Sequence, residues 1–371
     1  MKSANILVIG GGIGGLTSAI ALRRLGFGVD VIEKDPDWAV YGVGIIQQSN
    51  VVRAMADLGV LDEYLDAAFG FDHVDIFPPG GLAPIRVPSP KLVEGRPANI
   101  GIQRTALHKV LGDRVLATGA QVRLGVTATA LEDDGQGVTA RFSDGGEGRY
   151  DLVIGADGVF SDTRAVILPD SPAPEFTGQS VWRYNFPRPE GMDCLKAYEG
   201  SIGVGLVPLS AALMYMFVTT PEPGNPRYPR KGLAAAMRAK LVEAPQLMAE
   251  LAGQITDDDA VVYKPLECLF LEGDWHKGRI ALLGDAVHAT TPHLGQGAGM
   301  AIEDAVVLAD ELGRAETPEA AFKAYQARRR ARCEFTVRLS RAIGDGQIGK
   351  GPRVDQAKAA GDMFKLMAQP I

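Results

Sequence analysis

The stretch NILVIGGGIGGLTSAIALRRLGFGVDVIEK, residues 5–34, decides how this chain begins to fold. Its apolar run Asn5–Ile9 predicts a short buried strand. A glycine-rich turn follows, then an amphipathic helical segment, Leu16–Leu25, and then a second strand, Val29–Glu33. This order predicts a βαβ unit on a parallel sheet.

The turn has the chemistry of a dinucleotide site. Its GxGxxG pattern permits a tight turn, lets the backbone approach a pyrophosphate at the helix N-terminus, and allows the helix to pack closely on the strand. An acidic residue at the end of the second strand is placed to accept hydrogen bonds from ribose hydroxyls. The predicted site residues are Gly10, Gly12, Ile13, Gly14, Gly15, Glu33 and Lys34. The turn alone does not distinguish NAD from FAD.

The composition is that of a globular protein. The chain has 371 residues, of which 46% are hydrophobic, which suits two joined domains or one large domain. Its net charge of −7 would repel a phosphate backbone, so we expect no nucleic-acid partner. Cys194, Cys268 and Cys333 have no CxxC spacing, which favours a reducing compartment without disulfides or a structural metal.

Two apolar segments are too short for membrane roles. The run ending at Ile9 falls short of a signal-peptide core, and Val204–Val218 falls short of the ~20 residues that span a bilayer. We interpret Val204–Val218 as a buried hairpin. We therefore expect a cytoplasmic protein with no membrane attachment, either a monomer or a homodimer.

The remaining pattern predicts an α/β protein with two domains. Gln179–Phe270 alternates like strands, with a helical interruption at Leu233–Leu251, and a buried strand Ile280–Leu283 then leads into helices. We expect a discontinuous Rossmann-like dinucleotide-binding domain (1–70, 101–175 and 271–320). A β-sheet domain (71–100 and 176–270) and C-terminal helices (321–371) complete the prediction.

Two further motifs lie far downstream. DLVIGADG at 151–158 is followed by Ser161 and Arg164, and GDAVH at 284–288 is followed by PHLGQG at 292–297 and AIEDA at 301–305. Together with the first turn, these motifs resemble the group A flavoprotein monooxygenases, the para-hydroxybenzoate hydroxylase-like family. The likeness is greatest to its short single-component members acting on salicylate, hydroxynicotinate or urate, and it covers almost the whole chain.

The resemblance implies that the dinucleotide is FAD. Asp157 belongs to a motif that supports FAD and nicotinamide binding in relatives, and Asp285 would hold the ribityl hydroxyls. Arg104 matches a position that contacts the FAD phosphate region. The loop residues Gly295, Gly297, Ala298 and Gly299 would bring backbone amides to the flavin edge, where those of Ala298 and Gly299 would stabilise negative charge on the reduced ring. Glu303 and Asp304 are expected to serve packing and helix geometry.

The resemblance also implies a reaction. It is the NAD(P)H- and O2-dependent hydroxylation of a small aromatic or heteroaromatic compound through an FAD C4a-hydroperoxide. Residues 160–270 contain no second GxGxxG, so we expect NAD(P)H to bind transiently. The tryptophan motif and lysine of flavin-dependent halogenases are missing.

Two alternatives stay open. One is a flavin oxidoreductase or epoxidase that acts on a non-aromatic metabolite. The other is a catalytically silent binding protein like the GDP-dissociation inhibitors, against which the intact Gly10, Gly12, Glu33 and Asp285 argue.

The segments Trp182–Phe186 and Ile202–Val218 are the expected walls of the substrate pocket, by the same resemblance. Tyr215 falls where related hydroxylases carry a substrate-facing tyrosine, and a core tyrosine is the alternative. Residues 201–205 carry no arginine, so a carboxylate clamp is not expected there. Arg183 is the substitute on a neighbouring strand, although the adjacent Trp182 suggests a structural strand pair instead.

A histidine is the candidate general base. His293, beside Pro292 in the loop next to the flavin, would take a proton from a substrate hydroxyl, because an imidazole pKa near ~6.5 suits this task. A loop histidine that only bonds the backbone is the alternative, with Tyr215 or bound water as the next base. His73, His108 and His276 are expected to be surface or capping residues. The predicted catalytic residues are thus His293, Tyr215 and Pro292.

Overall fold

The computed structural model describes residues 4–242 and 246–371, and its first layer is a six-stranded sheet. The strand order is β18-β19-β12-β1-β2-β8, and each neighbouring pair from β19 to β8 is parallel. Ile6, Leu7 and Val8 of the central strand are fully buried, which explains why that run is apolar without alternation. The strands are β1 (Asn5–Ile9), β2 (Gly28–Glu33), β8 (Gln121–Leu124), β12 (Leu152–Gly155), β18 (His276–Lys277) and β19 (Ile280–Leu282).

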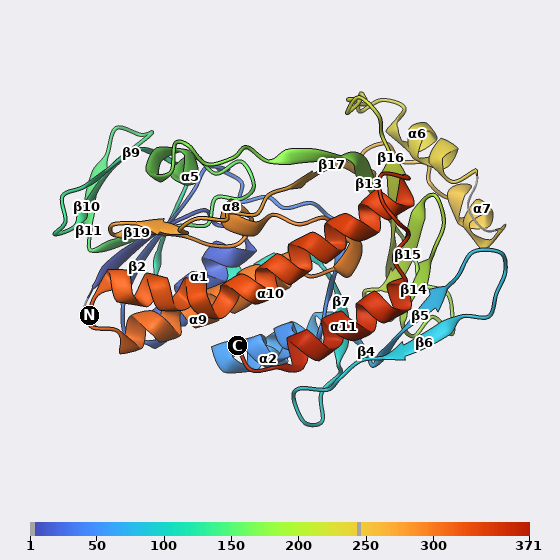
Figure 1. Ribbon diagram of the computed structural model, residues 1–371, viewed down its shortest axis with the longest axis horizontal. Helices are drawn as coiled ribbons and strands as arrows, with labels where there is room; N and C mark the ends of the chain where they lie inside the picture. Colours follow the sequence, from blue (N-terminus) through green and yellow to red (C-terminus); the bar gives the residue numbers. More distant parts are fainter. Residues whose placement is uncertain (1–3, 243–245) are drawn as a thin grey trace.

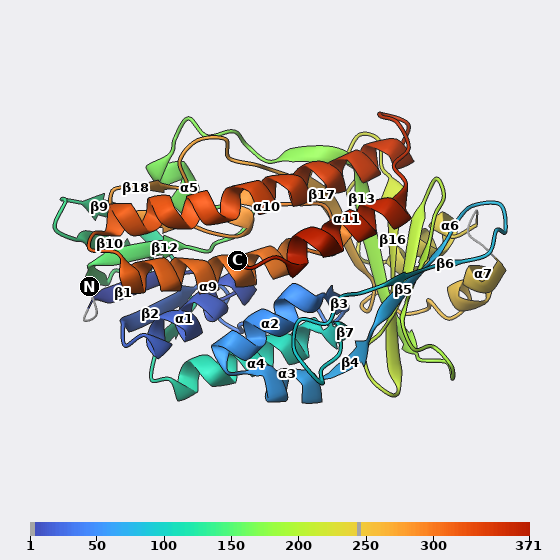
Figure 2. The same ribbon diagram turned by 60° about the horizontal axis from the view of Figure 1, so that its bottom comes forward.

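Helices pack along this sheet. The helix of the βαβ unit, α1 (Ile13–Arg24), packs against α9 (Gly297–Arg314) and α4 (Arg104–Ala117). Helix α10 (Pro318–Gln347) packs on α9, and Figure 2 shows the two running side by side. Two short helices, α5 (Asp162–Ile167) and α8 (Asp285–His288), follow β12 and β19. A small antiparallel sheet comprises β9 (Ala128–Asp133), β10 (Val138–Phe142) and β11 (Glu147–Tyr150).

A seven-stranded sheet forms the second layer, in the order β17-β13-β16-β15-β14-β5-β6. Every neighbouring pair is antiparallel except β14 with β5, which is parallel. The hairpin predicted at Val204–Val218 is confirmed as β15 and β16. The strands are β5 (His73–Phe77), β6 (Ile85–Pro88), β13 (Glu175–Pro187), β14 (Leu195–Tyr198), β15 (Gly203–Pro208), β16 (Leu213–Pro221) and β17 (Val262–Cys268).

Two helices cover the outer face of this sheet, as Figure 1 shows at the right. They are α6 (Leu233–Lys240) and α7 (Gln246–Ala252). Trp182 and Met216, both fully buried, belong to the same hydrophobic cluster as Met237 of α6. Residues 243–245, within the helix predicted at Leu233–Leu251, lie outside the described residues.

A three-stranded sheet joins the two layers. It contains β3 (Gly44–Gln47), β7 (Asn99–Gln103) and β4 (Ala68–Phe71), and α2 (Ser49–Leu58) and α3 (Leu61–Asp66) lie between β3 and β4 in the chain. A Cβ atom on Gly101 would lie 2.0 Å from the carbonyl oxygen of Pro208, and one on Gly44 would lie 2.2 Å from the Tyr215 ring. The layers approach this closely only because both positions are glycine.

The C-terminal helices bridge both layers. Helix α10 contacts β13, and α11 (Gln356–Ala368) packs on α10, α2 and β6. Both figures show α11 beside α10 and close to the second sheet. Within the two described ranges, no helix is long and apolar enough to cross a membrane. The predicted fold class, a Rossmann-like domain with a β-sheet domain and a helical C-terminus, is confirmed, whereas the domain boundaries stay a prediction.

Candidate active site

A cavity of about 780 Å³ lies where the two layers meet. Its walls come from the glycine turn after β1, from the loop between α8 and α9, and from one face of the seven-stranded sheet. The end of α11 closest to the second sheet also contributes side chains. A cavity of this size and position matches those that hold cofactors and small substrates.

The glycine turn is shaped for close backbone approach. Gly10 has φ +110°, and a Cβ there would lie 2.5 Å from the carbonyl oxygen of Ala156. A Cβ on Gly15 would lie 1.8 Å from the carbonyl oxygen of Gly10, whereas a Cβ on Gly12 would meet nothing within 4 Å. Gly12 precedes α1, whose N-terminus has no side-chain cap. The free amides and the open space beside Gly12 suit a pyrophosphate.

Glu33 stands directly behind this turn. Its carboxylate accepts the backbone N–H of Gly11 at 2.7 Å and that of Asp35 at 2.9 Å, one bond to each oxygen. Each oxygen keeps a free lone pair, so the group can still accept a ribose hydroxyl. His108 contacts the carbonyl oxygen of Gly11 at 3.0 Å and is buried. The prediction of a surface or capping role for His108 is therefore wrong, as it is for the buried His276 of β18.

Asp157 organises the second motif. One oxygen accepts the Ser161 hydroxyl at 2.5 Å and the other accepts the backbone N–H of Thr163 at 2.9 Å, so the carboxylate braces the start of α5. Arg164 on this helix donates to the carbonyl oxygen of Ala286 at 3.0 Å. The DG motif is thereby linked to the GD motif through one buried arginine.

The GD turn presents a carboxylate to the cavity. Gly284 has φ +62°, a left-handed conformation that favours glycine, and Asp285 follows it on the cavity wall. The Asp285 carboxylate is exposed to the cavity, but the surrounding protein shields it from bulk solvent, and this burial raises its pKa. The charges of His288 and Arg104 oppose the rise.

A buried charge network holds this turn. Asp304 accepts the backbone N–H of Gly284 at 3.0 Å, the His288 ring at 2.6 Å, and Arg329 at 2.7 Å. Burial acts against the Asp304 carboxylate, but the neighbouring His288 and Arg329 outweigh it and hold its pKa well below the usual range. Glu303 pairs with Arg329 at 2.7 Å. The packing role expected for Glu303 and Asp304 thus takes the form of ion pairs that fix the GD motif.

The loop before α9 is fastened from the opposite side. The Gln48 side-chain amide donates to the carbonyl oxygen of Leu294 at 2.8 Å, and that of Gln296 donates to Gln48 at 2.6 Å. The loop contains the 3-10 helix η1 (Pro292–Leu294), and α9 then begins at Gly297 with no side-chain cap. Gly297 and Ala298 line the cavity, so the first amides of α9 are available to a negatively charged ring edge.

Two guanidinium groups face the cavity, and neither forms an ion pair with a described carboxylate. Arg104 begins α4, and Arg183 lies within β13. Burial lowers the pKa of both; for Arg183 the pKa falls to about 10, with the charge of Arg104 as the second cause. Arg183 therefore stays charged at neutral pH. Trp182 and Arg183 point to opposite faces of one strand, so the structural packing of Trp182 does not keep Arg183 out of the cavity. A role of Arg183 in binding a substrate carboxylate stays a prediction.

Tyr215 shares this part of the cavity. It lies on β16, is almost fully buried, and its ring occupies the space that a side chain at position 44 would need. Burial raises its pKa, while the charges of Arg183 and Arg104 act in the opposite direction. The hydroxyl is therefore protonated at neutral pH and available as a hydrogen-bond donor.

His293 lines the cavity with both ring nitrogens partnered. Nδ1 lies 2.9 Å from the Thr291 hydroxyl, and Nε2 lies 3.1 Å from the Gln347 side-chain oxygen. Because Gln347 offers an acceptor, Nε2 carries the proton in this arrangement. Burial lowers the pKa of His293 to about 4, and the bond to Gln347 offsets this only partly. The ring is neutral at pH 7 and weaker as a base than expected; its role as the general base stays a prediction.

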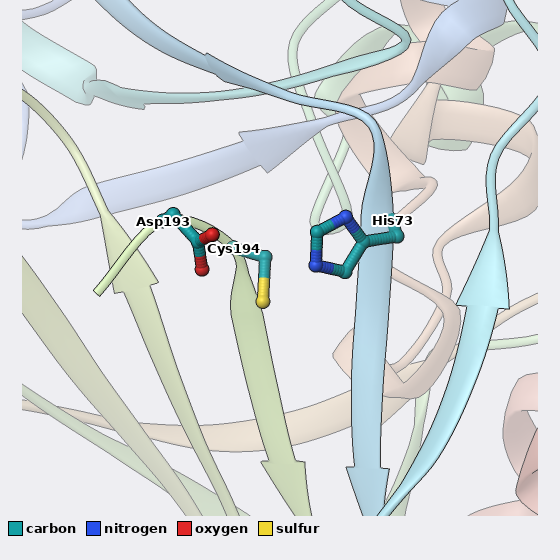
Figure 3. A group of neighbouring side chains, drawn as sticks. All are labelled: His73, Asp193 and Cys194. Carbon is teal, nitrogen blue, oxygen red and sulfur yellow. The ribbon is translucent and has the colours of Figure 1, made fainter. Parts of the chain in front are cut away.

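Two groups of potential metal ligands occur among the described residues: the buried His288, Asp304 and Cys333, and a second group at the rim of the seven-stranded sheet. His73, Asp193 and Cys194 place their ligand atoms within 4.8 Å of one another (Figure 3). However, the Cys194 thiol contacts Asp75 at 3.6 Å, and Arg86 already holds that carboxylate at 2.8 Å. Burial raises the pKa of Cys194 to about 12, so it is a neutral thiol that donates a hydrogen bond. We assign this second group a packing role.

The predicted site residues divide into those on the cavity wall and those behind it. The wall contains all three predicted catalytic residues and Gly12, Ile13, Gly14, Arg104, Asp285, Gly295, Gly297 and Ala298. Gly10, Gly15, Glu33, Lys34, Asp157 and Gly299 are not on the wall. The wall also contains residues that the motifs did not indicate, among them Gln48, Arg183 and Lys264.

Comparison with known proteins agrees with this geometry. The chain matches the family model described as an FAD binding domain over residues 3–340. It is 34% identical to the aurachin C monooxygenase/isomerase of Stigmatella aurantiaca, over 93% of this chain and 89% of that protein. It is 31% identical to the FAD-dependent urate hydroxylase of Klebsiella pneumoniae, over 95% and 92%.

Solved structures show the same likeness. The crystal structure of Klebsiella pneumoniae HpxO complexed with FAD and uric acid superposes with a TM-score of 0.83 at 28% identity, covering 98% of this chain and 92% of that chain. The uncapped helix ends and the open space beside Gly12 fit the same cofactor. The chain belongs to the group A FAD-dependent monooxygenases, and its cofactor is FAD.

Proposed function

We propose that this monooxygenase uses NAD(P)H and O2 to hydroxylate a small aromatic or heteroaromatic compound that carries an ionisable hydroxyl group. The observation that carries the proposal is the Arg183 guanidinium, which is charged, faces the cavity and has no acidic partner among the described residues. A buried, unpaired charge is costly to the folded protein. An anionic substrate would supply the missing partner.

The turn after β1, Glu33, Asp285 and the N-terminus of α9 would hold the cofactor. FAD, when bound, supplies the reducing equivalents taken from NAD(P)H and activates O2. In this proposal the first amides of α1 receive the pyrophosphate, and Asp285 receives the ribityl hydroxyls. Arg104, whose charge acts on both Asp285 and Tyr215, lies between the cofactor side and the substrate side of the cavity.

Arg183 would activate the ring electrostatically. A positive charge within a few ångströms favours the ionised form of a bound hydroxyl and so lowers the pKa of that hydroxyl. The phenolate-type anion is the more electron-rich species, which favours attack by an electrophilic oxygen. With Arg183 in this role, the site needs no strong base, which agrees with the low pKa of His293. His293 or a water molecule would then accept the proton, and Tyr215 would donate a hydrogen bond to the substrate.

The seven-stranded sheet would exclude water. Val181, Leu266 and Phe217 line the cavity beside Arg183. An apolar wall limits the access of solvent to the reacting atoms and strengthens the electrostatic interactions inside.

A substrate screen tests the proposal. The purified holoenzyme is incubated with phenols, hydroxybenzoates and hydroxypyridines, and NADH and NADPH oxidation, hydrogen peroxide and product mass are all measured. We expect at least one compound to stimulate oxidation and to gain one oxygen atom. Stimulated oxidation that yields only hydrogen peroxide throughout the panel would contradict the proposal.

A further inference from the structure

The cavity wall changes its chemical character along the seven-stranded sheet. Lys264 on β17 and Arg183 on β13 make one end cationic. Tyr215 and Phe217 on β16 follow, and the far end, at β14 and β5, presents only apolar side chains from these strands. They are Leu195, Ala197, Val74 and Ile76.

The opposite wall of that far end is also apolar. Ile343 of α10 and Ala360, Met363 and Phe364 of α11 line it, together with Leu294 of η1, which belongs to the loop before α9. Most of these residues belong to one hydrophobic cluster with Val74. We call this end of the cavity, which is lined by β5, β14, α10 and α11, the apolar compartment. The nearby polar side chains on the cavity wall, Asn99, Gln356 and His293, are uncharged at neutral pH.

Helix α11 is a fixed wall of this compartment. Arg53 donates to the carbonyl oxygen of Met367 at 3.3 Å, Arg332 to that of Gln369 at 3.0 Å, and Arg328 to that of Ile371 at 2.7 Å. Three arginines from α2 and α10 therefore hold the last turn of α11 and the residues that follow it. A compartment bounded by anchored elements has a defined length and will select among apolar groups by size.

We propose that the substrate is amphiphilic: its oxidisable ring lies beside Arg183, and an alkyl or aryl substituent of the ring occupies the apolar compartment. This inference rests on the proposed function, because it assumes that the same cavity binds the substrate ring. A compact polar ring would leave these apolar walls without a ligand group against them, and the walls offer water few hydrogen bonds. An apolar substituent would remove this surface from water.

Binding of a homologous series tests the inference without turnover. The probes are 2-hydroxybenzoates with n-alkyl chains of increasing length on the ring, and their dissociation constants are measured from flavin absorbance changes in the oxidised holoenzyme. We expect each methylene to tighten binding by about fourfold until the compartment is full, after which the gain stops. A dissociation constant that does not change, or that rises, over the first four carbons would overturn the inference.

Matched variants locate the effect. Ala360→Leu on α11 and Ala197→Leu on β14 each add bulk from one wall and should move the limit to a shorter chain. Ala357→Leu, on the same helix but not on the cavity wall, should leave the limit unchanged and excludes non-specific partitioning of long chains. FAD content establishes that each variant is folded, and the two wall variants report independently. An unchanged limit in both would overturn the inference.

The two proposals fail separately. Chain-length-dependent binding, with no hydroxylation of any probe or of any compound in the substrate screen, would refute the proposed function but not the compartment. Hydroxylation of unsubstituted rings with no chain-length dependence of binding would refute the compartment alone.

Discussion

Replacement of Arg183 by methionine separates the electrostatic role of this residue from its packing. Methionine keeps much of the side-chain length but removes the charge that faces the cavity. A hydrogen bond to a charged group is worth about 1.5–3 kcal/mol, which corresponds to about 10- to 150-fold in kcat/KM. We expect a loss in this range for substrates with an ionisable hydroxyl. Arg183→Lys should recover part of the loss, because it restores the charge without the planar fork.

The same change should leave the folded protein as stable or more stable. The fall in the Arg183 pKa from 12.5 to about 10 corresponds to at most about 3.5 kcal/mol against the charged form. Cavity water screens part of this, so we expect Arg183→Met to stabilise the apo-protein by about 1–2 kcal/mol. A loss of activity together with a gain in melting temperature is the signature of a charge kept for function rather than for folding.

The assay combines three measurements on each variant. These are steady-state kcat/KM with product quantification, the substrate dissociation constant, and the rate of flavin reduction by NAD(P)H. The pH dependence of kcat adds a fourth: its rising limb should move to higher pH in Arg183→Met, because the hydroxyl in the enzyme–substrate complex ionises less readily. Arg230→Met removes an exposed arginine that pairs with Asp259 in the same sheet domain and serves as the control. Arg183→Met within threefold of the parent in kcat/KM and substrate affinity, at full FAD content, would refute the reasoning.

Three further predictions concern the residues that support the site. His293→Ala should lower the hydroxylation rate less than tenfold and leave flavin reduction unchanged, because a neutral ring with a pKa of about 4 is a weak base. A loss of a hundredfold or more in single-turnover hydroxylation would instead identify His293 as the general base. Asp157→Ala should weaken FAD binding or slow flavin reduction by NAD(P)H more than it changes the substrate profile, because it removes the hydrogen bonds that position α5 and, through Arg164, the link to Ala286. A larger effect on the substrate profile than on FAD binding or reduction would contradict this prediction. Asp304→Asn should cost about 3–5 kcal/mol in unfolding free energy at neutral pH, since it leaves Arg329 and His288 without their shared carboxylate. Because the pKa of Asp304 is lowered by folding, its contribution is present above pH ~4 and is lost as the pH falls further, so denaturation curves of parent and variant should converge in acid.

Local sequence patterns predicted the parts of this protein whose chemistry depends on the backbone. The turn at Gly10–Gly15, the GD turn and the start of α9 each follow from residues adjacent in the chain, because backbone shape is set locally. The fold class followed from the same stretches. The charge network did not, since Asp304 meets Arg329 and His288 across helices that are adjacent only in the folded protein.

The substrate side was harder to predict for a similar reason. The alternation of β13 contained the signal for Arg183: Trp182 packs beneath α6, so its neighbour must face the cavity. Nothing in the sequence of α11 indicates that Ala360 and Met363 reach the site, because that depends on how the C-terminal helix returns to the sheet. The low pKa of His293 likewise reflects burial that exists only in the folded protein, where α10 packs on η1.

The most direct test of the account is the source of the oxygen atom in the product. Holoenzyme is supplied with NAD(P)H, the best compound from the screen and ¹⁸O2 in unlabelled water, and the product mass is measured under conditions in which NAD(P)H oxidation is coupled to product formation. The account predicts one ¹⁸O atom in each hydroxylated aromatic product and none when NAD(P)H is omitted. A product whose new oxygen comes from water, or one formed equally well without NAD(P)H, would contradict it.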